Sequence, residues 1–190
     1  MSETARTDST SYPLFLPPDA LAEKGSDYWS KSESEQYLDW LVDAIDTRLS
    51  GLAGYLKMDI QPKEAASTLS VCGTRVALAV QLPDFSLVED GIKKLSPSAG
   101  YSIGADVGLL FAHLLLYASG SQLAWSIGRG PKSYVSRNLP VIVGFTDNME
   151  LDPVLVGINM CRRVLREGSA SSWQQVYEHW RQRIPVCASA

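Results

Sequence analysis

Apolar residues recur at steps of three and four positions in five segments of this 190-residue chain, which is the period of amphipathic helices. The longest segment, 32–57, begins with Ser32 and Glu35 at the spacing of a capping box. The second begins at Pro62, a residue that suits the first position of a helix. Its later part, 71–80, is rich in valine and contains Gly73, so both helix and strand stay open there.

The third segment, from Ile103 to Ala118, is apolar on nearly every side, which is typical of a buried core helix. At 1.5 Å per residue it would span about 24 Å, less than the roughly 30 Å hydrocarbon core of a bilayer. It also contains Asp106 and His113. We therefore expect a core helix and no membrane partner. Two further helices are expected, one opened by Asp152-Pro153 and the last over 172–183.

Two strands are expected between the central and the C-terminal helices. Segment 122–127 alternates loosely, and 139–145 contains a β-branched run. Their connection, 128–138, is too long for a tight hairpin turn. Segment 84–100 shows neither period and is expected to be a loop. The pattern predicts an α+β fold: a mainly helical single domain with a small antiparallel β element between the central and C-terminal helices.

The first 30 residues differ from the rest of the chain. Serine, threonine and aspartate dominate up to Ser11, and Pro17 and Pro18 favour extended backbone. We expect 1–30 to form an extended N-terminal arm and 31–185 to form a single globular α+β domain. The chain is too short for two comfortable domains.

Composition excludes several classes of function. A net charge of −4 argues against a nucleic-acid partner, because nucleic-acid-binding proteins are usually basic. The three cysteines, Cys72, Cys161 and Cys187, are far apart and odd in number, so we expect reduced thiols and no zinc site. The N-terminal residues lack the apolar core of a signal peptide. Together these features indicate a cytoplasmic protein.

No recognisable catalytic motif occurs. The chain lacks a G-x-S-x-G elbow, a phosphate-binding P-loop and a G-x-G-x-x-G fingerprint. His113 is expected to be a core histidine, and Asp106 to form a structural salt bridge with Arg129, Lys132 or Arg137. We therefore predict no enzyme, no catalytic residue, no metal and no cofactor. The alternative is a small-ligand-binding protein or hydrolase with a cleft near Asp106, His113 and the 128–138 basic loop, and a Cys161–His113 pair also stays open.

Two charged features indicate a partner-binding surface. Acidic residues follow one face of the first long helix, and the 128–138 connection is basic and carries an aromatic residue. The competing interpretations are a solvated helix face and an exposed loop. The predicted partner-binding residues are Glu35, Asp39, Asp43, Asp46, Arg129, Lys132, Tyr134 and Arg137.

The leading hypothesis is a non-enzymatic protein-interaction module, of the immunity or accessory kind, in which the acidic ridge meets a basic protein partner such as a toxin. Nucleic-acid binding through the arginines is a third hypothesis, which predicts strong salt dependence. The oligomeric state is left open.

The order of motifs resembles a family of uncharacterised bacterial proteins of about this length. The resemblance rests on Tyr37-Leu-Asp-Trp40, the Asp106-Val-Gly108 helix, Gly130-Pro-Lys-Ser-Tyr134 and the Asp152-Pro153 helix. It covers most of the chain after residue 30. It implies an α+β fold and an accessory role, with no established activity, cofactor or catalytic residue.

Overall fold

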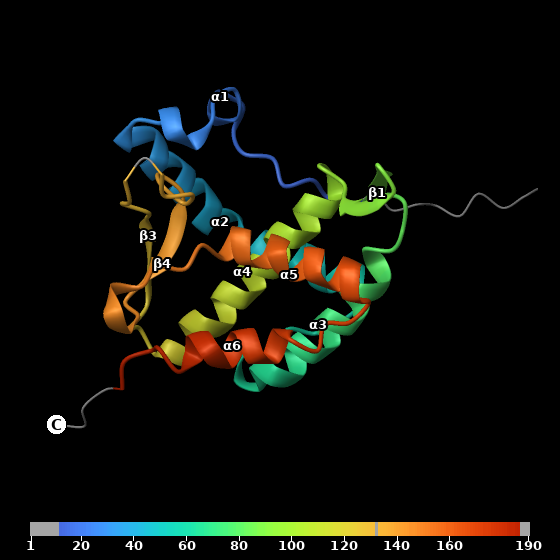
Figure 1. The fold of residues 1–190 in the computed structure, drawn as a ribbon. Coiled ribbons are helices and arrows are strands. Elements are labelled where there is room, and N and C mark those ends of the chain that lie inside the picture. The colour runs from blue at the N-terminus through green and yellow to red at the C-terminus, as the bar shows by residue number, and fades with distance from the viewer. Residues whose placement is uncertain (1–11, 132, 187–190) are drawn as a thin grey trace, which may run out of the picture.

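The computed structural model describes residues 12–131 and 133–186, and it confirms the predicted mainly helical α+β fold (Figure 1). The described residues form six α-helices and two separate antiparallel sheets of two strands each. The sheets lie on opposite sides of the helical core. The helices are α1 (Asp19–Ala22), α2 (Lys31–Leu56), α3 (Ala65–Ala79), α4 (Ala99–Ser119), α5 (Pro153–Glu167) and α6 (Trp173–Arg181). The strands are β1 (Ser86–Glu89), β2 (Ile92–Leu95), β3 (Ala124–Ile127) and β4 (Pro140–Val143), and short 3₁₀ turns η1 (Ser26–Tyr28), η2 (Pro62–Glu64) and η3 (Thr146–Asn148) separate some of them.

Helix α4 is the centre of the core, as its continuous apolar sequence predicts. It is long and apolar enough to span a membrane, but 83% of its most apolar window is buried inside the protein, as in a core helix. Helix α5 crosses α4 at a contact made by glycines. A Cβ atom added at Gly157 would lie 2.2 Å from the Gly104 carbonyl oxygen and from the Gly108 nitrogen. Only glycine therefore permits this close crossing.

Helix α2 begins two residues earlier than predicted, because the capping box is formed by another pair. Glu33 donates its backbone N–H to the Ser30 hydroxyl oxygen at 3.3 Å, and the Ser30 N–H donates to the Glu33 carboxylate at 2.7 Å. Ser30 is extended, as an N-cap must be, whereas Ser32 is already helical. At the other end Arg75 donates to the carbonyls of Leu56 and Lys57.

Segment 71–80 is helical, so the strand alternative there is wrong. It belongs to α3, and Gly73 lies where this helix meets the start of α6. A Cβ atom at Gly73 would lie 2.5 Å from the Cβ atom of Ala170 and 3.2 Å from the Trp173 ring. The glycine that weakened the helical prediction is thus explained by packing between helices.

The prediction of a loop over 84–100 is wrong. The segment contains the β1–β2 hairpin, in which Ser86 pairs with Leu95 and Glu89 with Ile92. The hairpin turns at Asp90 and Gly91, which have φ values of 52° and 75°. An Asp-Gly pair is a strong signal for this two-residue turn, and periodicity alone missed it because the strands are only four residues long.

The predicted β element between the central and C-terminal helices is confirmed. Strands β3 and β4 pair antiparallel, with Ala124 opposite Val143 and Ile127 opposite Pro140. Both strands are shorter than predicted. A bridge between Ile142 and Leu151 then leads the chain directly into α5. This sheet packs against α2 and holds the ends of the 128–138 connection.

The described part of the N-terminal arm lies on the domain. Residues 12–18 form neither helix nor strand, whereas α1 and η1 add helical turns between 19 and 28. Tyr12 is only 4% exposed and packs edge-on against Tyr55 and Phe85. The described part of the arm therefore contains helical turns that the expectation of an extended arm did not include, and its polar residues 1–11 lie outside the described residues.

Candidate functional site

Asp106 is held by α2 and the arm, not by the basic loop. Its two oxygens accept from Arg48, at 2.7 Å from Nε and 2.6 Å from the second terminal nitrogen, and the Tyr12 hydroxyl donates at 2.5 Å. The Asp106 side chain is 1% exposed. The predicted pairing with Arg129 or Arg137 is therefore wrong, and Lys132 lies outside the described residues. Asp106 lies in the buried helix and faces α2, from which Arg48 reaches it.

This buried cluster organises the arm. Arg48 also donates to the backbone carbonyls of Pro13 and Leu14, and the Phe15 N–H donates to the Ser102 hydroxyl at 2.8 Å. Burial raises the pKa of the Asp106 carboxyl, whereas the hydrogen bonds from Arg48 and Tyr12 lower it. Because both carboxyl oxygens are bound and shielded from water, the cluster fixes structure and leaves no open position for a substrate.

The structure does not assemble the alternative cleft. His113 is half-buried on α4, two turns from Asp106, which is about 10 Å along the helix axis. Asp106 is sealed by its partners, so it cannot exchange protons with a ligand beside His113. The 128–138 loop lies instead between η1, α2 and the start of α5. The loop therefore lies away from Asp106, while His113 lies two turns further along the same helix.

The described cysteines are inert. Cys72 and Cys161 are free and fully buried, and burial raises the pKa of the Cys72 thiol to about 12 and that of Cys161 well above its usual range. A thiolate is therefore scarce at neutral pH, which argues against the Cys161–His113 pair as a nucleophile and base. Among residues 12–131 and 133–186, no three His, Cys, Asp or Glu side chains are grouped as metal ligands. Cys187 lies outside the described residues.

We expect a Cys187→Ser variant to resist iodoacetamide at about pH 8 while it is folded, and to react at two thiols once urea unfolds it. The reason is that Cys72 and Cys161 have no access to solvent. Mass spectrometry of the alkylated protein measures both states. Rapid labelling of the folded variant would contradict the burial of these thiols.

The acidic ridge lies on the surface of α2, as the helical spacing predicts. Glu35, Asp39, Asp43 and Asp46 are all exposed. Glu35 approaches Lys31 at 3.5 Å, while the other three form no ion pair within the described part of the chain. Like charges four residues apart cost an isolated helix about 0.2–0.5 kcal/mol per pair. Asp39, Asp43 and Asp46 therefore form a strip of negative charge that no described residue neutralises by an ion pair.

The ends of the connection between β3 and β4 are joined by hydrogen bonds. Gly128 and Asn138 close it through backbone hydrogen bonds, 2.9 Å from the Gly128 N–H to the Leu139 carbonyl and 3.0 Å from the Asn138 N–H to the Gly128 carbonyl. The Asn138 side chain also donates to the Ser26 carbonyl at 2.8 Å, which fastens the loop to η1. Of the predicted basic residues, Lys132 lies outside the described residues.

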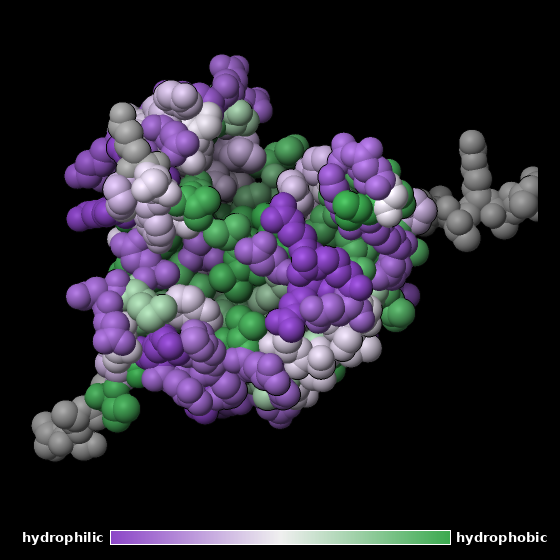
Figure 2. Space-filling model, viewed as in Figure 1, coloured by the Kyte–Doolittle hydropathy of each residue, from purple (hydrophilic) through white to green (hydrophobic). Residues whose placement is uncertain are grey.

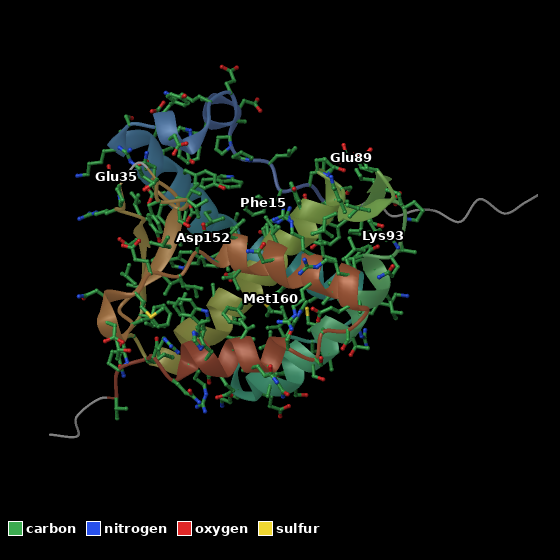
Figure 3. All side chains as sticks on the ribbon, viewed as in Figure 1. Phe15, Glu35, Glu89, Lys93, Asp152 and Met160 are labelled. Carbon is green, nitrogen blue, oxygen red and sulfur yellow. The ribbon has the colours of Figure 1, made fainter. Side chains whose placement is uncertain are left out.

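A hollow of about 510 Å³ brings two of the predicted features together. Arg129 and Arg137 from the loop line it, and Glu35 lines it from the end of the acidic ridge (Figure 3). The rest of the ridge, Asp39 to Asp46, continues along α2 outside this hollow. The structure thus joins the loop to the start of the ridge and leaves the remaining carboxylates as a separate strip.

An apolar pocket of about 210 Å³ lies on the other side of the same loop, and sequence reasoning missed it. It opens between the loop, β4 and the start of α5, where Figure 2 shows a green hollow among purple residues. Its lining comes from α2, from the loop and β4, and from the start of α5: Tyr37, Val135, Leu139, Pro140, Asp152, Val154, Leu155 and Ile158. In the sequence, the signal for this pocket was that Val154, Leu155 and Ile158 fall on a flank of α5 beside its buried face.

One carboxyl borders this pocket. Asp152 caps α5 by accepting from the Leu155 N–H at 2.9 Å, as predicted, and burial raises the pKa of its carboxyl (Figure 3). Tyr37 lies across the pocket, where burial raises the pKa of its phenol to about 12. Burial and the nearby Glu150 raise the pKa of the Tyr134 phenol. The pocket is therefore an apolar depression with a polar rim.

Two hollows beside the 128–138 loop form the candidate site. It consists of the apolar pocket, the neighbouring hollow with two arginines and a carboxylate, and the acidic strip beyond. Comparisons of the chain with protein-family models, with curated proteins and with solved structures gave no match.

Proposed function

We propose that this chain is a non-enzymatic protein-interaction module, and that it binds its partner through the 128–139 loop and the two hollows beside it. The observation that carries the proposal is the apolar pocket of about 210 Å³ that opens beside Val135, a loop residue that is 70% exposed. An exposed apolar side chain next to an open apolar socket is the arrangement of an interface anchor point.

The size of the pocket favours a protein partner over a small ligand. Small-molecule sites usually enclose about 300–1,000 Å³, more than this pocket offers. The space suits one large apolar side chain inserted by a partner, which is how interface hot spots are built. Arg129 and Arg137 of the adjoining hollow are of a residue type enriched at such interfaces, whereas Tyr134 lines neither hollow.

The charge of the acidic ridge indicates that the partner is basic. Asp39, Asp43 and Asp46 of the acidic ridge, which form no ion pair with any described residue, would attract a basic protein and orient it as it approaches the pocket. An immunity or accessory protein that captures a basic toxin fits this arrangement. The family resemblance and the cytoplasmic location expected from the sequence belong to the same proposal.

We expect the variant Val135→Glu to lose at least about 90% of a partner captured from the native host, because a carboxylate at the pocket mouth opposes insertion of an apolar side chain. The measurement is affinity capture followed by mass spectrometry, then titration of the purified partner. The variant Leu78→Glu is the matched control, because Leu78 on α3 is 71% exposed and lies away from the loop.

Equal capture by the wild type and Val135→Glu would remove the pocket from the interface. The same titration with the variants Asp39→Lys and Asp43→Lys tests whether the acidic ridge takes part in binding. If the ridge faces a basic partner, the charge reversal slows association and weakens the dependence on salt. An unchanged association rate would restrict the interface to the two hollows.

A further inference from the structure

A third hollow, larger than the two beside the loop, forms a groove at the C-terminal end of α5, beside the β1–β2 hairpin. Its volume is about 850 Å³. The hairpin forms one wall, the first turn of α4 forms the floor, and the last two turns of α5 form the other wall. Figure 3 places Glu89 and Lys93 on this hairpin, far from Asp152 at the pocket beside the loop. The groove is therefore separate from the proposed interface.

The groove is basic although the chain as a whole is acidic. Four cationic side chains line it, Lys93, Lys94, Arg162 and Arg166, against a single carboxylate, Glu89. Glu89 pairs with Lys94 at 2.6 Å. Arg166 forms no ion pair with any residue that the structure describes. In a chain of net charge −4, this local excess of positive charge favours binding of an anionic group in the groove.

One of these cations is held in place before any ligand arrives. Arg162 donates to the Tyr101 hydroxyl at 2.9 Å, and its guanidinium lies 5.3 Å from the centre of the Tyr101 ring. It also donates to the Asn159 amide oxygen at 3.3 Å. A guanidinium has five N–H donors, so this one keeps donors free for a carboxylate. Its fixed position lowers the entropy that binding would cost.

The hairpin also offers apolar surface and unpaired backbone. Val88 is 69% exposed, Ile92 is 60% exposed and Leu87 is 38% exposed. Each strand pairs only with the other, so within the described residues both outer edges of the hairpin lack a neighbouring strand. Free strand edges are sites where an extended segment adds by backbone hydrogen bonds. Two strands alone are only marginally stable, so a third would stabilise them.

We propose that this groove binds an extended acidic segment of a partner protein, in which acidic and apolar residues alternate. The segment would pair with an edge of the hairpin. Because side chains alternate along a strand, the carboxylates of the segment would point to one side, toward Arg162 and Arg166, and its apolar side chains to the other. Val88 and Ile92 lie on opposite faces of the hairpin, so the apolar side chains would cover one of them. An anionic lipid surface is the less suitable occupant, because the cations line a concave groove between two walls.

The test uses the full-length protein and a fluorescent short peptide of alternating glutamate and valine. We expect binding with a dissociation constant below about 1 mM that weakens as salt is raised. The peptide should also slow amide hydrogen exchange in 86–95. A peptide with lysine in place of glutamate should not bind. Absence of binding by the acidic peptide, or stronger binding to vesicles of anionic lipid than to the peptide, would overturn the proposal.

Substitutions in the groove test whether the peptide binds there. The double substitution Arg162→Gln and Arg166→Gln should weaken peptide binding about tenfold, because it removes two exposed positive charges and the contacts that hold Arg162 against Tyr101. Arg163→Gln is the matched control: Arg163 lies on the same helix but pairs with Glu167 at 2.9 Å, outside the groove. Equal weakening by the control would assign the effect to net charge and overturn the site. Val135→Glu should leave peptide binding unchanged, so this groove and the loop site can fail independently.

Discussion

Replacing Arg48 by methionine should lower the free energy of unfolding by about 3–5 kcal/mol. The substitution leaves the Asp106 carboxylate buried at 1% exposure with no cation beside it, and a buried charge without a partner is among the costliest defects in a protein. It also removes the donors that hold the Pro13 and Leu14 carbonyls. Urea unfolding followed by tryptophan fluorescence measures the change, and limited proteolysis should show earlier cleavage of the arm.

The control variant for this experiment also removes the charge of Asp106. Arg48→Met combined with Asp106→Asn should recover a large part of the lost stability, because asparagine is neutral and still accepts from the Tyr12 hydroxyl. A loss below about 1 kcal/mol for Arg48→Met alone would mean that water reaches Asp106. That result would reopen Asp106 as a chemically accessible group.

Replacing Gly157 by alanine should destabilise the fold by about 3 kcal/mol or more, or prevent folding. The added methyl group would lie 2.2 Å from backbone atoms of Gly104 and Gly108, and two helix backbones cannot move apart without disturbing the core between α4 and α5. Thermal unfolding followed by circular dichroism measures the effect.

Gly54→Ala is the matched control for the glycine contact. Gly54 also lies in a helix, α2, but a Cβ atom there would meet nothing within 4 Å. That substitution should leave stability unchanged or raise it by up to about 1 kcal/mol, because alanine has the higher helix propensity. Similar losses for both variants would show that the close crossing of α4 and α5 is not what requires glycine.

Several features follow from residues that are neighbours in sequence. The apolar period of α2, α4 and α5 places their buried faces, and Asp152-Pro153 marks the start of α5 as predicted. The same spacing places the acidic ridge on the surface of α2. The capping box was predicted at Ser32 and Glu35 but is formed by Ser30 and Glu33, because both serines have a glutamate three residues later. Local spacing could not tell which serine has extended backbone.

The candidate site was only half predictable. The basic loop and the ridge were visible as charge runs, but the apolar pocket combines residues of α2, the loop, β4 and α5. No local pattern contains such a set, since each member reads as an ordinary core or surface residue of its own element. The groove beside β1 and β2 was missed for a related reason: its hairpin was predicted to be a loop.

Periodicity, caps and turns depend on groups within about four residues of one another, so the linear chain already specifies the helices, most of their ends and the buried character of α4. The partners of Asp106 lie 58 and 94 positions away, and the close crossing of α4 and α5 joins Gly104 and Gly108 to Gly157. Packing selects such distant contacts from many chemically equivalent ones. For that reason only the folded molecule decides that Asp106 is a sealed structural group and that the open surfaces lie at the two ends of α5.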